Sequence, residues 1–158
     1  MHLETALQTD KFRNAQHKLL LYIMHTRSVI HLEQKRRLVP WGITPEQYNV
    51  LRILRGQGNQ PMALNDLTCR MIDPASNASR LVEKLRAKGL VTRKAARQDR
   101  RRVDVALTPA GLHCVESATP ELLEVELWFE EAVPADLAQQ LNLAFDAFHT
   151  KRLETEIL

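Results

Sequence analysis

The chain has 158 residues, of which 44% are hydrophobic and 26% charged, and its formal net charge is +3. This composition suits one ordinary folded core and excludes a disordered chain. The longest apolar run, Leu19–Met24, is far shorter than the ~20 residues of a membrane span. No signal peptide is expected, and two cysteines make no disulfide framework, so we expect a mainly helical protein of the reducing cytoplasm.

Hydrophobic periodicity predicts a long first helix over residues 12–38. Apolar side chains recur there every three to four residues, and Pro40 ends the pattern. The apolar stripe is wider than one neighbour would cover, so we expect this helix to pack on two sides. A second helix begins at Thr44, which forms a capping box with Gln47, and the glycines from Gly56 onward end it.

Two further helices complete a predicted helix-turn-helix. The third helix is short, follows an extended segment and has Asn65 as its expected cap. For the fourth helix we expect Asp73 as the cap and Pro74 as the first residue, with Gly89 as the stop after Lys88. Short helices joined by a turn of three or four residues are typical of this motif.

A β-hairpin and two helices complete the chain. The expected strands are residues 90–94 and 102–107, and the second alternates apolar and polar side chains as a half-buried strand does. A helix is predicted from Thr108, with a kink or a break at Pro120. A last helix begins near Pro134.

Positive charge is concentrated in one segment. Between Arg80 and Arg102 ten lysines and arginines stand against Glu83 and Asp99, a net charge of +8, so the rest of the chain sums to −5. Residues 108–158 carry ten acidic groups against two basic ones, a net charge of −8. A basic patch is the electrostatic footprint of a surface that meets phosphate, so we predict binding to double-stranded DNA. A merely solvated charged face is the competing interpretation.

The fourth predicted helix has the two faces of a recognition helix. Its apolar positions are Ala78, Leu81, Val82 and Leu85. The other face has short hydrogen-bonding side chains at its N-terminal end and long basic ones further on. The first turns of such a helix approach base edges in the major groove while its basic groups reach phosphates. The hairpin would then be a wing, with its basic tip over the neighbouring minor groove.

Three segments carry a family resemblance: "ITPEQYNVLRIL", "LNDLTCRMIDPASNASRLVEKLRAKGLVTR" and "DRRRVDVALTPAG". They resemble the MarR family of transcriptional regulators, strongly over residues 43–112, and the flanking helices extend the likeness to nearly the whole chain. The resemblance implies a mainly α fold with a small β-hairpin wing. It also implies a winged helix-turn-helix domain (41–108) between an N-terminal dimerisation helix (1–40) and C-terminal dimerisation helices (109–158).

The resemblance implies a homodimer in which each subunit presents its recognition helix to one half of a palindromic operator. Dimer geometry predicts half-sites about one helical turn apart, ~10 bp. The DNA-binding residues that match the family pattern or its basic surroundings are Ser76, Asn77, Ser79, Arg80, Lys84, Arg97, Arg100, Arg101 and Arg102. Asp99 is the expected wing brace that orients an arginine, although a role in starting a tight turn is equally compatible.

The resemblance further implies a repressor that a small aromatic ligand releases from DNA, and no cofactor is expected. The residues that could line a ligand crevice are Tyr22, His25, Trp41 and Tyr48. Each is also compatible with a place in the core or at its rim. The alternative function is a winged-helix module that contacts proteins or serves an architectural role without sequence-specific regulation.

Neither a thiol sensor nor a metal site is expected. Some members of the family sense oxidants through a cysteine in the first helix, where this chain has none, so Cys69 and Cys114 are predicted to be buried and inert. The histidines and Glu33 of the first helix do not place three ligands on one face. The chain has no phosphate-cradling glycine loop, no HExxH motif and no nucleophile elbow, so catalysis is not expected.

Overall fold

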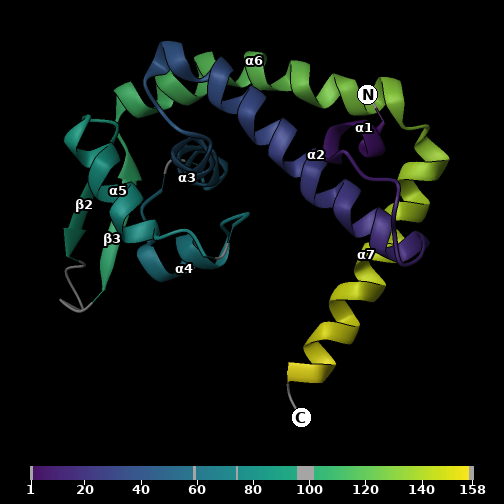
Figure 1. The fold of residues 1–158 in the computed structure, drawn as a ribbon. Helices are drawn as coiled ribbons and strands as arrows, with labels where there is room; N and C mark the ends of the chain where they lie inside the picture. The colour runs from purple at the N-terminus through teal and green to yellow at the C-terminus, as the bar shows by residue number, and fades with distance from the viewer. Residues whose placement is uncertain (1, 59, 74, 96–101, 157–158) are drawn as a thin grey trace. The chain divides into compact units, whose positions relative to one another are not determined.

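A computed structural model describes residues 2–58, 60–73, 75–95 and 102–156 (Figure 1). The chain divides into two compact units, Met1–Glu121 and Leu122–Leu158. The functional division at residues 40 and 108 stays a prediction. No helix among the described residues is long and apolar enough to cross a membrane.

The first unit begins with a helix that the periodicity did not reveal. This helix, α1 (Leu3–Leu7), has only five residues, and its Leu3 is buried. The predicted long helix is α2 (Ala15–Arg37), which starts later than expected because Asn14 caps it by accepting a hydrogen bond from the His17 N–H at 2.8 Å. A 3-10 turn, η1 (Val39–Trp41), follows.

Much of the apolar stripe of α2 is exposed in the described structure. No residue of α2 is buried, and Leu19, Met24 and Leu32 are 50%, 60% and 68% exposed. The prediction that this helix packs on two sides is not tested by a single chain, because a second subunit is absent. The stripe leaves an apolar surface without a described neighbour.

The winged helix-turn-helix follows in the expected order. Its elements are α3 (Pro45–Gly56), β1 (Met62–Ala63), α4 (Leu64–Cys69), α5 (Ala78–Ala87), β2 (Val91–Ala95) and β3 (Val103–Leu107). The capping box of Thr44 and Gln47 is confirmed at the start of α3. The sheet has three antiparallel strands in the order β1-β3-β2, because Met62 pairs with Val105 beside the predicted hairpin.

Two of the predicted helix starts are wrong. Asn65 does not cap α4, because the helix begins directly after β1 with Ala63 in the cap position. Asp73 does not cap α5, which begins at Ala78, and Pro74 lies outside the described residues. The Asp73 carboxylate instead accepts a hydrogen bond from the Ala75 N–H at 3.1 Å and closes a turn, and Asn77 is the cap. The segment between α4 and α5 is consequently longer than three or four residues.

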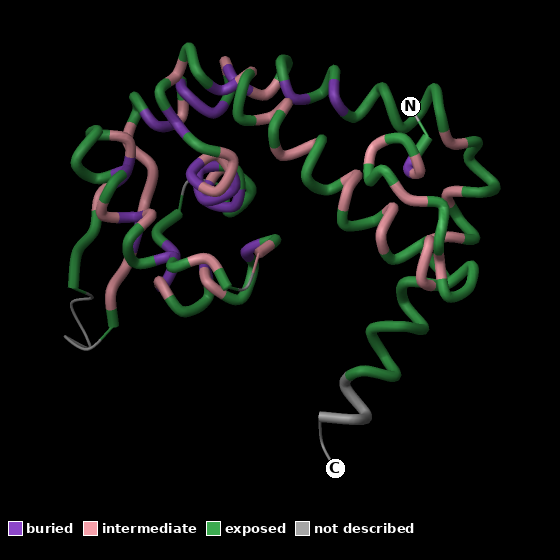
Figure 2. The backbone as a smooth tube through the Cα atoms, viewed as in Figure 1, coloured by how far each residue is buried: buried purple, intermediate pink, exposed green. Residues whose placement is uncertain are grey.

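The core of the first unit lies where α3, α5 and the sheet meet. Leu51 and Leu54 of α3, Val82 and Leu85 of α5 and Val105 of β3 are at most 1% exposed. Figure 2 colours the buried residues purple, and many of them lie in α3. This packing fixes α5 against α3 and leaves its opposite face to solvent.

The remaining helices are α6 (Pro109–Ala132) and α7 (Ala135–Glu156). Pro120 lies inside α6 and does not split it. Its side chain and that of Glu116 are exposed, so water can reach the carbonyl that loses its helical donor.

The two cysteines differ in exposure, and the prediction for one of them is wrong. Cys114 is buried, as expected, and burial raises the pKa of its thiol. Cys69 is exposed, because the short helix α4 buries only Leu67. We therefore expect one thiol per native chain to react rapidly with Ellman's reagent, and none in a Cys69→Ser variant. Two rapidly reacting thiols would contradict the burial of Cys114.

An acidic residue on α2 predicts a pH dependence of stability. Hydrogen bonds from Arg36 and Arg37 lower the pKa of Glu33 to about 2 from its ordinary 4.5. Arg37 also donates to the Glu121 carbonyl of α6 at 3.1 Å, so Glu33 orients a side chain that joins two helices.

Because the folded pKa is depressed, the stabilisation by Glu33 is fully present above about pH 4.5 and is lost as the pH falls toward 2. A Glu33→Gln variant should have a lower thermal midpoint than the wild type at pH 7. The difference should shrink near pH 3, and a difference that stays constant with pH would contradict this role.

Candidate nucleic-acid interface

The outward face of α5 carries the predicted DNA-contacting side chains. Ala78, Val82 and Leu85 are buried, whereas Leu81 is half-buried at the edge of the core. On the opposite face, Ser79, Arg80 and Lys84 are exposed. The predicted separation of the two faces is thus confirmed, except that Leu81 is only partly covered.

The N-terminus of α5 is held by Asn77. Its Oδ1 accepts a hydrogen bond from the Arg80 N–H at 2.9 Å, which satisfies one of the free amides at the start of the helix. Asn77 is exposed, so its Nδ2 can still donate to a base or phosphate acceptor. Ser76, just before it, is half-buried, and its N–H donates to the Asp73 carbonyl at 3.1 Å.

The basic segment contains cations with different roles. Arg86 and Arg93 each contact the Glu83 carboxylate at 3.0 Å, and they lower the pKa of Glu83. Lys88 donates to the Gly42 carbonyl and, at 3.2 Å, to Gln47 Oε1. These three cations have partners within the domain. Exposed pairs of this kind contribute little stability, but they orient the side chains involved.

Arg80, Lys84 and Lys94 form the exposed cationic set of the described interface. All three side chains are exposed, and none has an ion-pair partner among the residues that the structure describes. Charges that are free of internal partners can neutralise phosphates and release counterions. Arg80 and Lys84 lie one helical turn apart on α5, so they can follow one DNA strand.

The wing continues this surface at the end of the sheet. Arg102 precedes β3, is exposed and contacts Asp104 at 3.0 Å. The predicted tip residues Arg97, Asp99, Arg100 and Arg101 lie outside the described residues. Their predicted contacts with DNA, and the role of Asp99 as a brace, stay predictions.

The contact between Glu83 and Arg93 is a brace that the sequence analysis missed. It joins the recognition helix α5 to strand β2 and so fixes the base of the wing relative to the helix. The periodicity of a helix or a strand does not indicate a contact between residues that lie ten positions apart on two different elements. The excess of basic residues around a lone Glu83 was the available signal.

The four candidate ligand residues have different surroundings. The Tyr22 hydroxyl accepts a hydrogen bond from the Leu3 N–H of α1 at 3.4 Å. The Tyr48 hydroxyl lies 3.0 Å from Thr119 Oγ1 of α6, to which Arg55 also donates at 3.1 Å. His25 lies on α2 and Trp41 in η1, and both are half-buried. No described contact joins these four side chains, so their shared crevice stays a prediction.

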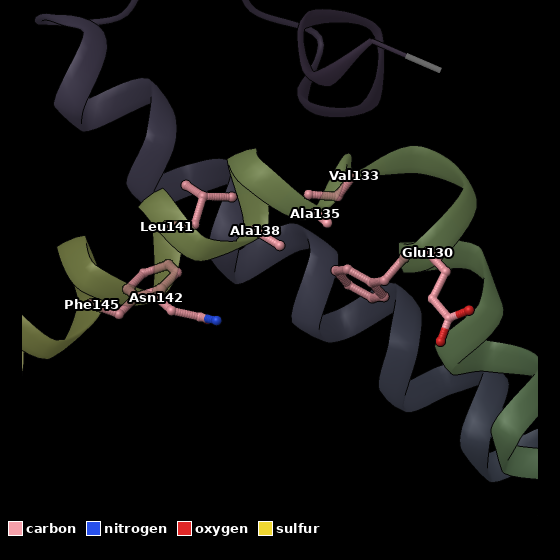
Figure 3. Close-up of a pocket in the computed structure, with 8 residues that line it drawn as sticks. Glu130, Val133, Ala135, Ala138, Leu141, Asn142 and Phe145 are labelled. Atoms are coloured by element: carbon pink, nitrogen blue, oxygen red, sulfur yellow. The ribbon is translucent and has the colours of Figure 1, made fainter.

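A cavity of about 440 Å³ lies elsewhere, within the second unit (Figure 3). The residues that line it come from the end of α6, the turn and α7: Phe129, Glu130, Val133, Ala135, Ala138, Leu141, Asn142 and Phe145. None of the four candidate ligand residues is among them. In the described part of the chain, no group of three or more His, Cys, Asp and Glu residues could hold a metal ion.

The chain is similar to known regulators in sequence and structure. A family model described as MarR family matches residues 41–102. The transcriptional repressor MprA of Escherichia coli is 27% identical over 121 residues, which cover 72% of this chain and 69% of MprA.

Two solved structures share the fold. The S. aureus MepR–DNA complex has a TM-score of 0.75 and 23% identity, over 89% of this chain and 99% of MepR. The organohalide-sensing regulator RdhR-CbdbA1625 in its 2,4-dichlorophenol-bound form has a TM-score of 0.76 and 16% identity, over 87% of this chain and 81% of that one.

Proposed function

The chain belongs to the MarR family of DNA-binding winged-helix transcriptional regulators, which are not enzymes, and on that premise we propose that it represses transcription as a homodimer bound to a palindromic operator. Each subunit inserts α5 into the major groove of one half-site. The wing lies along the neighbouring minor groove. Occupation of the operator then excludes RNA polymerase from the promoter.

The observation that carries this proposal is the outward face of α5. An asparagine caps its N-terminus and Ser79 follows. Arg80 and Lys84, which have no ion-pair partner among the described residues, come next along the exposed face. Short polar side chains at the tip of a helix suit base edges, and long cations behind them suit phosphates. The fold that this chain shares with MepR, whose structure is a complex with DNA, supports the same orientation.

The uncovered apolar side chains support the dimer. They lie on α2 and on the two C-terminal helices, and those more than 40% exposed include Leu19, Leu20, Met24, Leu32, Leu123, Leu127, Phe129, Leu143 and Phe148. Large exposed apolar surfaces mark interaction sites. A second copy of the chain would cover them and would hold two α5 helices at the spacing of successive major grooves.

A small aromatic ligand is the proposed effector. The fold is shared with a regulator solved with 2,4-dichlorophenol, which supports an aromatic ligand of this kind. A ligand releases DNA only by the difference between its affinities for the two states of the dimer. Titration of the protein–operator complex with 2,4-dichlorophenol and related phenols tests the proposal, and release should depend on ligand concentration.

Selection of duplexes from a random pool tests the main proposal. The purified protein is incubated with the pool at near-physiological salt, and the retained duplexes are sequenced. We expect an inverted repeat with half-sites about one turn apart, ~10 bp. Retention without a consensus would mean an architectural binder. No retention would favour a winged-helix module that contacts proteins.

A further inference from the structure

Asn49 is a buried polar residue on α3, the helix that packs behind the recognition helix. Its side chain is 6% exposed, and its Oδ1 accepts a hydrogen bond from the Ile72 N–H at 3.1 Å. Its Nδ2 is buried without a hydrogen-bond partner among the described residues. A buried donor without a partner lowers stability, and an apolar side chain of similar size would avoid that cost. Asn49 therefore keeps one hydrogen bond, to the Ile72 amide, at the cost of a buried donor without a described partner.

The amide that Asn49 holds begins the turn that leads into α5. Ile72 itself is 77% exposed, so side-chain packing does little to fix this residue. The next residue, Asp73, accepts hydrogen bonds from the N–H groups of Ala75 and Ser76, both at 3.1 Å. Asn77 then caps α5. The described hydrogen bonds of this segment thus begin at Ile72, which Asn49 holds to α3.

We propose that Asn49 is a positioning residue for DNA recognition, which sets through the Ile72 amide where Ser76, Asn77 and Ser79 lie against the bases. This inference rests on the proposed function, because it concerns the same surface. The body of α5 is held by its own buried side chains, so the effect of Asn49 is confined to the turn and the first turn of α5. We expect Asn49 to have no effect on the position of Lys84 or of the sheet.

Two variants separate this role from a purely structural one. Asn49→Leu removes the acceptor and the unpaired donor at similar size, whereas Asn49→Asp keeps an acceptor oxygen for the Ile72 amide. For each, affinity is measured for the selected operator and for a scrambled duplex of equal length. We expect Asn49→Leu to lose about tenfold in operator affinity while its scrambled-duplex affinity is retained. Asn49→Asp should keep most of the wild-type ratio of the two affinities.

Other outcomes overturn the proposal. An unchanged affinity ratio in Asn49→Leu, despite faster hydrogen exchange of the Ile72 amide, would show that the turn does not govern recognition. An equal loss of both affinities would indicate a structural role only. If Asn49→Leu does not fold, the same comparison is made with Asn49→Ala.

The failure of this inference is distinct from that of the proposed function. If the wild-type protein selects no consensus sequence, both the proposed function and the role of Asn49 are wrong. If the wild-type protein selects an operator and the Asn49→Leu variant discriminates equally well, only the role of Asn49 is wrong.

Discussion

Replacement of Arg80 by alanine is expected to weaken operator binding about 10- to 100-fold, which corresponds to the ~1–3 kcal/mol of a specific arginine contact. Arg80 is exposed on α5, and no ion-pair partner among the described residues holds it to the protein. Its loss removes one cation from each half-site. In a dimer, the slope of log affinity against log salt should therefore become shallower by about 2. Fluorescence anisotropy with labelled operator at several salt concentrations measures both quantities.

Lys11→Ala is the matched control, because it removes the same charge at a distant place. Lys11 is exposed and precedes α2, whose 23 residues span ~35 Å and lead toward the winged helix (Figure 1). A charge so far away is screened at physiological salt, where the Debye length is about 8 Å. We expect an unchanged slope in this variant. Equal losses in the two variants would mean that net charge, rather than the patch on α5, governs binding.

Local sequence signals predicted the start of α3 correctly. Thr44 and Gln47 form the expected capping box because both partners lie within one turn of the chain. At the recognition helix the expected cap, Asp73, was wrong. Its carboxylate accepts a hydrogen bond from the Ala75 N–H and lies 3.5 Å from Arg27, and Asn77 caps α5. The contact between Arg27 and Asp73 joins residues 46 positions apart, so no local sequence pattern indicates it.

Short elements and contacts between distant segments were not predictable for the same reason. Strand β1 has two residues, too few for a period, and exists because Met62 and Ala63 pair with β3. The two faces of α5 followed from periodicity alone. Periodicity did not predict which cations of α5 form ion pairs. Arg86 pairs with Glu83, which also contacts Arg93 of β2, and such contacts depend on the folded structure. Sequence therefore predicted the surface but not which charges remain available on it.

Replacement of Gly111 by alanine is expected to destabilise the first unit by about 3 kcal/mol, at the upper end of the cost of overpacking. A Cβ at this position would lie 1.9 Å from the Leu90 carbonyl oxygen and 3.2 Å from Leu107 Cδ2. The Leu90 carbonyl cannot move aside freely, since it accepts the Thr108 N–H at 3.1 Å. The better helix propensity of alanine, about 1 kcal/mol, offsets only part of this. Urea unfolding followed by circular dichroism measures the loss.

The same substitution should also reduce DNA binding, because the close approach at Gly111 joins α6 to the start of the wing. Thr108 Oγ1 donates to the Gly89 carbonyl at 2.7 Å and accepts the Gly111 N–H at 3.0 Å, so a displaced helix start would move strand β2 as well. Gly56→Ala is the control: its added Cβ meets no atom within 4 Å, and stability should stay equal or rise. A Gly111→Ala protein as stable as Gly56→Ala would mean that α6 can shift away from Leu90 without cost, and the wing would then not depend on this contact.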